Sequence, residues 1–163
     1  MEQKQKVYQE LDRLEIKYEI IEHSAVYTIE EMDSLEVFHD NPSVAKNLFL
    51  RDASGKHHFL VVMDKDKKAD LKLIRKQLGA STLSFASEER LMEHLKLKKG
   101  SVTPLGIIND QKHIVEVVID STLVDREYIG VHPNDNTATV ILSYHDLCIY
   151  LQMNGTTLHI INI

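Results

Sequence analysis

Three short segments of this sequence combine residue types that could bind and hydrolyse a polar substrate. In the first segment, Lys46 and Asn47 open the apolar stretch 48–50. A lysine at the start of a strand is usually a solvated surface residue, and the spacing alone favours that interpretation. The alternative is a cation at the mouth of a pocket, where it would hold a phosphate or a carbonyl oxygen.

The second segment is a loop whose backbone is constrained at both ends. A glycine lets the backbone approach a ligand closely, and a proline stiffens the chain. Such a loop can present N–H and C=O groups at fixed positions to an ester and its neighbouring hydroxyl. A glycine that ends a helix, followed by a proline, would explain the same composition. The loop residues are Gly100, Ser101, Val102, Thr103 and Pro104.

The third segment, 131–137, places His132 beside a proline within a run of polar residues. The sequence Pro-Asn-Asp-Asn is ordinary turn chemistry. A histidine held by a proline-fixed turn could also point into a cleft and contact a substrate amino group or ester. The residues support the two interpretations equally.

Several common catalytic signatures are missing from the sequence. It has no G-x-S-x-G nucleophile motif, no P-loop, no dinucleotide fingerprint and no HExxH. The nine histidines are scattered, and the single cysteine, Cys148, excludes an internal disulfide and a cysteine-rich zinc site. We therefore predict neither a metal site nor a covalent serine mechanism.

The composition predicts one globular domain over residues 1–163. Hydrophobic residues make up 43% and charged residues 27% of the chain. The net charge of −6 argues against a general nucleic-acid binder, although a local group of cations could still hold one end of an RNA. The sequence contains no apolar run of the signal-peptide or membrane-span type, so we expect a cytoplasmic protein without membrane association.

Periodicity and turn signals predict a mixed α/β fold with a central, mostly antiparallel sheet of about six or seven strands and helices packed on it. A hairpin should join two of these strands, and Ser87 and Ser143 should cap helices. The predicted helices cover 3–16, a short segment after Thr28, 68–78, 87–95, a turn at 120–124, and 143–154. The predicted strands cover 17–23, 46–51, 57–63, 82–85, 106–109, 113–119, 128–132, 137–142 and 157–163.

Taken in order, these segments resemble the prolyl-tRNA editing domain family, the free-standing relatives of the editing insertion of bacterial prolyl-tRNA synthetases. The resemblance covers nearly the whole chain and is closest to the alanine-specific deacylases, rather than to the relatives that clear cysteine from tRNA(Pro). The matching residues are Lys46–Arg51, Gly100–Gly106, His132-Pro133 with Asn136–Thr139, Glu22–Thr28, and Asp146-Leu147 with Asn154-Gly155.

The resemblance implies hydrolysis of the ester between alanine and the terminal adenosine of tRNA(Pro), without a metal, a cofactor or a covalent intermediate. Lys46 would hold the terminal phosphate or the aminoacyl carbonyl region, and Asn47 would bind nearby. The Gly100–Pro104 loop would position the ester and the ribose hydroxyl, and His132 would help hold the aminoacyl end. An aminoacyl ester is already activated, so positioning water and stabilising the oxyanion suffice.

Further expectations concern specificity and partners. Ile29 and Met32 would form a pocket wall that excludes proline by size, although simple core packing is the favoured explanation for either residue alone. Lys98 and Lys99 would form a positive rim with Lys46, which Arg51 and Lys56 could extend. The expected partners are the acceptor end of aminoacylated tRNA(Pro) and prolyl-tRNA synthetase, with the protein a monomer or homodimer. The alternatives are a deacylase of Cys-tRNA(Pro) or Ser-tRNA, and a non-catalytic module that senses aminoacyl-tRNA or an amino acid.

Overall fold

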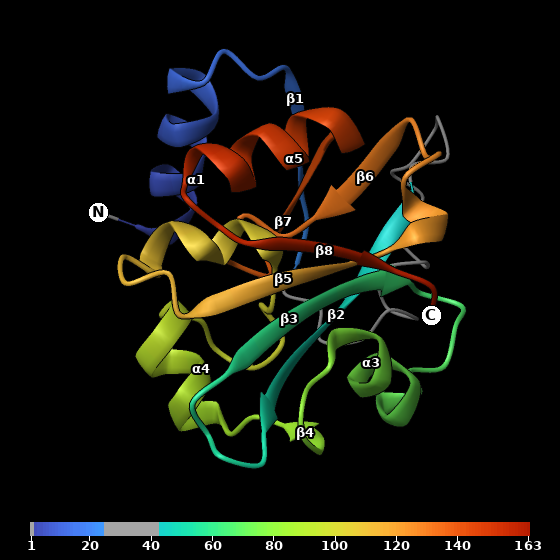
Figure 1. Ribbon diagram of the computed structural model, residues 1–163. Helices are drawn as coiled ribbons and strands as arrows, with labels where there is room; N and C mark the ends of the chain where they lie inside the picture. The colour runs from blue at the N-terminus through green and yellow to red at the C-terminus, as the bar shows by residue number, and fades with distance from the viewer. Residues whose placement is uncertain (1, 25–42) are drawn as a thin grey trace.

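The computed structural model describes residues 2–24 and 43–163, and its central element is an eight-stranded sheet (Figure 1). The strand order is β1-β7-β6-β2-β3-β5-β8, and β4 pairs with β2. The strands are β1 (Tyr18–Glu22), β2 (Ser43–Asp52), β3 (His58–Asp64), β4 (Leu83–Phe85), β5 (Val115–Asp120), β6 (Tyr128–Val131), β7 (Ala138–Ser143) and β8 (Leu158–Ile161). The helices are α1 (Gln3–Arg13), α3 (Leu71–Leu78), α4 (Glu88–Leu95), α5 (Tyr144–Met153) and the 3₁₀ helices η1 (Pro104–Asn109) and η2 (Ser121–Leu123).

The predicted fold class is confirmed. Four strand pairs are antiparallel, namely β1–β7, β2–β3, β2–β4 and β6–β7, and the predicted hairpin is β2–β3. Three further pairs, β2–β6, β3–β5 and β5–β8, are parallel. These parallel pairs join strands that are distant in sequence, so turn signals could not indicate them.

Local side-chain chemistry sets most helix ends. The hydroxyls of Ser87 and Ser143 accept from Arg90 N and Asp146 N, which confirms both predicted caps. The Asp70 side chain accepts from two amides and starts α3 at Leu71 rather than at residue 68.

The predicted strand over 106–109 is wrong. That segment belongs to η1, because the Thr103 side chain caps Leu105 N and Pro104 occupies the first turn. The helix predicted after Thr28 lies outside the described residues.

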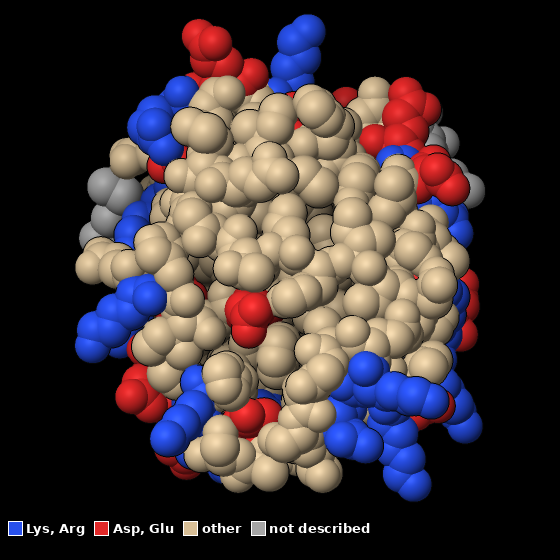
Figure 2. All heavy atoms as spheres, viewed as in Figure 1, with Lys and Arg blue, Asp and Glu red and all other residues tan. Residues whose placement is uncertain are grey.

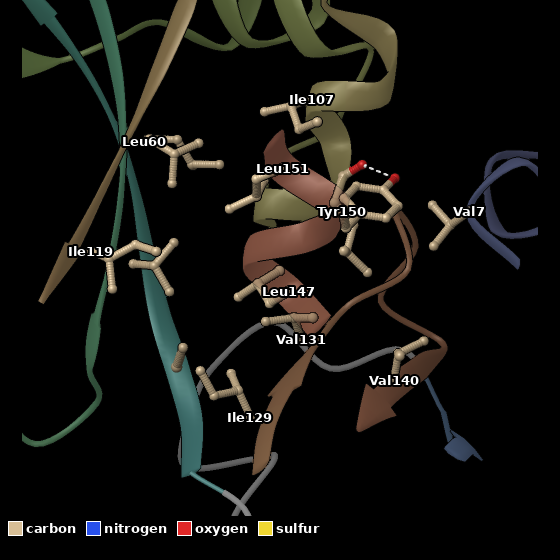
Figure 3. Close-up of a cluster of buried hydrophobic side chains, with 14 of the residues drawn as sticks. Val7, Leu60, Ile107, Ile119, Ile129, Val131, Val140, Leu147, Tyr150 and Leu151 are labelled. Atoms are coloured by element: carbon tan, nitrogen blue, oxygen red, sulfur yellow. Dashed lines mark hydrogen bonds between the residues drawn. The ribbon is translucent and has the colours of Figure 1, made fainter. Parts of the chain in front are cut away.

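Apolar side chains fill both faces of the sheet. The larger cluster packs α1, α4, α5 and η1 against one face, and Figure 3 shows Leu60 and Ile119 of the sheet facing Leu147 and Leu151 of α5. Within this cluster, the fully buried Tyr150 donates its hydroxyl to Leu105 O at 2.8 Å and so ties η1 to α5. The second cluster packs Ile74 of α3 against the opposite face. None of the helices in the described ranges is both long and apolar enough to cross a bilayer.

Gly106 shows how tightly η1 is packed. A Cβ atom at this position would lie 2.6 Å from Leu97 Cδ1. We expect Gly106→Ala to lower the free energy of unfolding by about 1–3 kcal/mol, the usual cost of overpacking, as measured by urea denaturation. In the double variant Gly106→Ala/Leu97→Ala the clash is relieved, so the loss should be clearly smaller than the sum of the two single losses. Simple additivity would show that the close contact is not the cause.

Candidate functional site

The candidate site lies where β2 changes partners. On one side β2 pairs with β3 from Ala45 to Arg51. On its other side it pairs with β6 only at Ser43 and Val44, and with β4 only from Leu50 onward. Within the described part of the chain, residues 45–49 of β2 therefore have a strand neighbour on one side only. An edge of this kind has backbone N–H and C=O groups that can pair with a ligand or with another segment, although Phe49 O already accepts from Ala86 N.

The structure brings His132 and the Gly100–Pro104 loop together at this place. His132 follows β6 directly, two residues beyond the Gly130–Val44 pair. The fully buried Thr103 donates its hydroxyl to the His132 carbonyl oxygen at 2.6 Å. The same hydroxyl caps η1 at Leu105 N, so one side chain fixes the loop, the helix and the histidine backbone.

The Gly100–Pro104 loop does not follow directly on a helix. The alternative explanation of its composition, a glycine that ends a helix, is therefore wrong. Helix α4 ends at Leu95, with Lys96 as the left-handed capping residue. Gly100, at φ +89°, belongs to a separate turn in which Ser101 N donates to Lys98 O. Glycine is required here because other residues rarely adopt this backbone conformation.

Replacing Thr103 tests this link. We expect Thr103→Val to lower the free energy of unfolding by about 1–2 kcal/mol, because it removes a buried hydrogen bond and a helix cap together. The isosteric valine keeps the volume, and Thr103→Ser, which keeps the hydroxyl, should stay close to wild type. The check is chemical denaturation of the three proteins. A valine variant as stable as the wild type, with the loss confined to the serine variant, would show that the methyl group, not the hydroxyl, matters.

The His132 ring is held in one orientation. Its Nδ1 atom lies 2.9 Å from Ala138 O. A carbonyl oxygen can only accept, so Nδ1 carries the proton and Nε2 of the neutral ring is an acceptor. Burial lowers the pKa of His132 below its ordinary value and favours this neutral form. Among the described residues Nε2 has no hydrogen-bond partner, so it can accept a hydrogen bond from a substrate or a water molecule.

A second histidine stands beside the first. The rings of His23 and His132 are 6.2 Å apart in an edge-on arrangement. His23 Nδ1 donates to Ser24 O, and the buried Thr139 hydroxyl lies 2.9 Å from His23 Nε2. In the sequence His23 stands only as part of the matching segment Glu22–Thr28, because its 109-residue separation from His132 hides the pairing.

Asn47 supplies an unused acceptor on the same face of the sheet as the loop. In a strand, alternate residues share a face, so Asn47 lies with Ala45 and Phe49, which pack in the larger cluster. Its Oδ1 atom is buried, and no described residue donates to it. An unmatched buried acceptor costs about 1–3 kcal/mol, so a donor on a bound ligand would stabilise this position.

Lys46 leaves β2 on the opposite face. It alternates with Leu48 and Leu50, which pack against the second cluster. Its ammonium donates to the Lys67 carbonyl oxygen in the loop after β3. Lys67 is itself held by the fully buried Asp120 at 3.1 Å and by Ile163 O at 2.9 Å. Because the two side chains leave opposite faces, Lys46 and Asn47 can contact the same ligand only if the ligand lies at the open edge of β2.

The predicted rim lysines, Lys98 and Lys99, are not brought to this edge. Lys98 and Lys99 are exposed and line an open groove of about 720 Å³ along α4. Three carboxylates, from Glu88, Glu89 and Glu93, share this groove with the three lysines 96, 98 and 99, so its charge is balanced. Ile29 and Met32 lie outside the described residues. Within residues 2–24 and 43–163, no group of three or more His, Cys, Asp or Glu side chains is arranged to hold a metal ion.

Comparison with known proteins defines the class of this chain. The family model of the aminoacyl-tRNA editing domain matches residues 23–148, and the chain belongs to this family. It is an aminoacyl-tRNA deacylase, as the sequence predicted.

Individual relatives within this family are similar to the chain over nearly its whole length. The chain is 53% identical to the prolyl-tRNA editing protein ProX of Acetoanaerobium sticklandii, over 96% of this chain and 95% of that protein. It is 37% identical to prolyl-tRNA synthetase associated domain-containing protein 1 of Mus musculus, over 90% of this chain and 88% of that protein. A solved structure described as a candidate trans-editing enzyme for prolyl tRNA synthetase shares the fold, with a TM-score of 0.74 and 16% identity over 100% of this chain and 98% of that one.

Proposed function

We propose that this protein hydrolyses Ala-tRNA(Pro) in trans, with residues 1–163 acting as a single editing domain. The observation that supports this most directly is the Thr103–His132 hydrogen bond, which sets the loop beside a neutral histidine whose Nε2 atom has no hydrogen-bond partner among the described residues. The name and 53% identity of the Acetoanaerobium sticklandii protein support tRNA(Pro) as the RNA.

The reaction needs positioning rather than a strong nucleophile. A water oxygen bonds to the aminoacyl carbonyl carbon, and the bond from that carbon to the ribose 3′ oxygen breaks. The proton lost by the water reaches the 3′ oxygen, with the neighbouring 2′-hydroxyl as carrier, and alanine and tRNA(Pro) are released. Holding the ester and the water in a fixed geometry supplies most of the rate increase.

Each site residue has a role in this scheme. His132 Nε2 accepts a hydrogen bond from the substrate ammonium group or from the water. The backbone of the loop Gly100–Pro104 positions the ester and the ribose hydroxyl. Asn47 Oδ1 accepts from the aminoacyl end, and Lys46 holds the terminal phosphate or stabilises the carbonyl oxygen. The scheme requires no metal and no cofactor.

Selectivity against proline is proposed to be steric. Ile29 and Met32 would close a pocket that admits a methyl side chain and excludes the proline ring. One methylene changes affinity by only about 1–3 kcal/mol, whereas a side chain that does not fit is rejected more strongly. Lys98 and Lys99 would contact RNA at the rim. The protein would act as a monomer or homodimer and would dock on prolyl-tRNA synthetase.

A panel of charged tRNAs tests the choice of amino acid. Ala-tRNA(Pro), Cys-tRNA(Pro) and Ser-tRNA are incubated with the protein, and ester hydrolysis is followed by the release of labelled amino acid. We expect alanine to be released fastest. Faster release of cysteine or serine would replace alanine in the proposal, and tight tRNA binding without any release would favour a sensing module.

A further inference from the structure

The cations of this acidic protein are concentrated in one short segment. Residues 65–76 contain six of the 19 lysines and arginines, against only two carboxylates, in a chain of net charge −6. The segment comprises the loop after β3 and the first six residues of α3. In Figure 2 the Lys and Arg atoms gather over α3, whereas the centre of the same face carries few charges.

Four of these cations are exposed and have no carboxylate partner among the described residues. Lys68, Lys72, Arg75 and Lys76 are exposed, and we call these four residues the α3 basic surface. None of them has a carboxylate within 4.0 Å among the described residues. Asp70 does not neutralise them by contact, since its side chain caps the helix at Lys72 N and Leu73 N.

The arrangement has an electrostatic cost for the free protein. Lys72 and Lys76 are four residues apart on one helix face, and like charges at this spacing destabilise a helix by about 0.2–0.5 kcal/mol. Ile74, fully buried on the opposite side of α3, fixes the helix so that the cations face outward. A polyanion bound across this face would remove the repulsion.

The α3 basic surface adjoins the candidate site. Asp64, where the loop begins, pairs with Ala45, the neighbour of Lys46. The Lys46 ammonium donates to the carbonyl oxygen of Lys67, which immediately precedes Lys68. The groove beside Lys98 and Lys99 has balanced charges instead, so it offers a polyanion no net attraction.

We propose that the α3 basic surface binds the sugar–phosphate backbone of the tRNA acceptor arm while the aminoacylated 3′ end lies at the open edge of β2. This inference rests on the proposed function for the identity of the RNA. Lysine and arginine contacts to phosphates are independent of base sequence, so this surface supplies affinity and orientation rather than the choice of tRNA.

The test compares two double variants with the same change of charge. Lys72→Gln/Lys76→Gln alters the α3 basic surface, and Lys17→Gln/Lys112→Gln removes two exposed lysines from loops elsewhere. Glutamine matches lysine in helix propensity, so α3 should keep its stability, which thermal melting checks. Binding to uncharged tRNA(Pro) is measured by fluorescence anisotropy between 50 and 200 mM KCl.

We expect the α3 variant to bind about 10-fold more weakly at 50 mM KCl, and the slope of log K against log salt to fall by about 1–2 in magnitude. The control variant should keep the wild-type slope. Equal slopes for the two variants, or wild-type binding that does not respond to salt, would overturn the proposal.

A second substrate separates this inference from the proposed function. The alanyl ester of the trinucleotide CCA carries the reacting end but no acceptor stem. The α3 variant should cleave it at the wild-type rate and lose activity only on full Ala-tRNA(Pro). If the α3 variant loses the same factor on both esters, the surface does not act through the acceptor arm. If the wild type cleaves neither ester, the proposed function fails, and the anisotropy slopes still decide whether the surface binds RNA.

Discussion

Replacing Lys46 by alanine should lower kcat/KM for deacylation of Ala-tRNA(Pro) by about 100-fold or more, the usual effect of removing one preorganised group that stabilises developing charge. The ammonium of Lys46 is anchored on the Lys67 carbonyl and stands at the start of the open edge of β2. At this position the ammonium can neutralise a phosphate or the oxyanion while its hydrogen bond to Lys67 O keeps the side chain in place. The measurement is the single-turnover rate of alanine release.

Two further variants make the result specific. Lys46→Arg keeps the charge but spreads it over a planar group, so it should recover only part of the rate. Lys17→Ala removes an exposed lysine from the loop between α1 and β1 and should leave the rate within twofold of wild type. A Lys46→Ala rate equal to that of Lys17→Ala would remove Lys46 from the site.

Replacing Asp120 by alanine should lower the free energy of unfolding by about 3 kcal/mol, because it removes a buried carboxylate together with its ion pair to the partly exposed Lys67 and its two backbone hydrogen bonds. The Asp120 carboxylate is fully buried and accepts from Lys67 Nζ, Asp64 N and Thr122 N at 3.1–3.2 Å. These bonds fix the loop after β3, and the Lys67 carbonyl oxygen of this loop accepts from the Lys46 ammonium. Deacylation should therefore fall as well, even where the variant is folded. Asp125→Ala, at an exposed position, is the matched control and should change stability little.

The contribution of Asp120 should depend on pH in a defined direction. Burial acts to raise the pKa of Asp120, but the hydrogen bonds from Thr122, Asp64 and Lys67 outweigh it and lower the pKa below the ordinary value. A lowered folded-state pKa gives stability that is present above the unfolded pKa of about 3.9 and is lost as the pH falls through the folded pKa. Urea denaturation at pH 7 and pH 3 should show the difference between wild type and Asp120→Ala shrinking at pH 3. A constant difference would contradict the ion-pair explanation.

The features that the sequence predicted well are local ones. The caps at Ser87 and Ser143 each depend on an amide three residues away, and the β2–β3 hairpin depends on one short turn. The error at 106–109 is local too, since the Thr103 cap and Pro104 together start a 3₁₀ helix where an apolar run resembles a strand. Fold class follows from such local elements, and it was predicted correctly.

The features that build the site are long-range. Thr103 and His132 are 29 residues apart, and Lys67 and Asp120 are 53 apart. No periodicity links such pairs, so the sequence could suggest the loop and the histidine but not the bond between them. The run of lysines before α3 was visible in the sequence, yet its proximity to Lys46 depends on how β3 pairs with β2. For the same reason, sequence reasoning placed Lys46 and Asn47 side by side without showing that they leave opposite faces of one strand.

The most direct test of the account is the hydrolysis of two esters of the same RNA, Ala-tRNA(Pro) and Pro-tRNA(Pro), by the wild-type protein. We expect rapid release of alanine, with Pro-tRNA(Pro) surviving as long as it does in buffer alone. Hydrolysis of both esters at similar rates would contradict the proposed selectivity, and survival of both would contradict the assignment of Ala-tRNA(Pro) as the substrate.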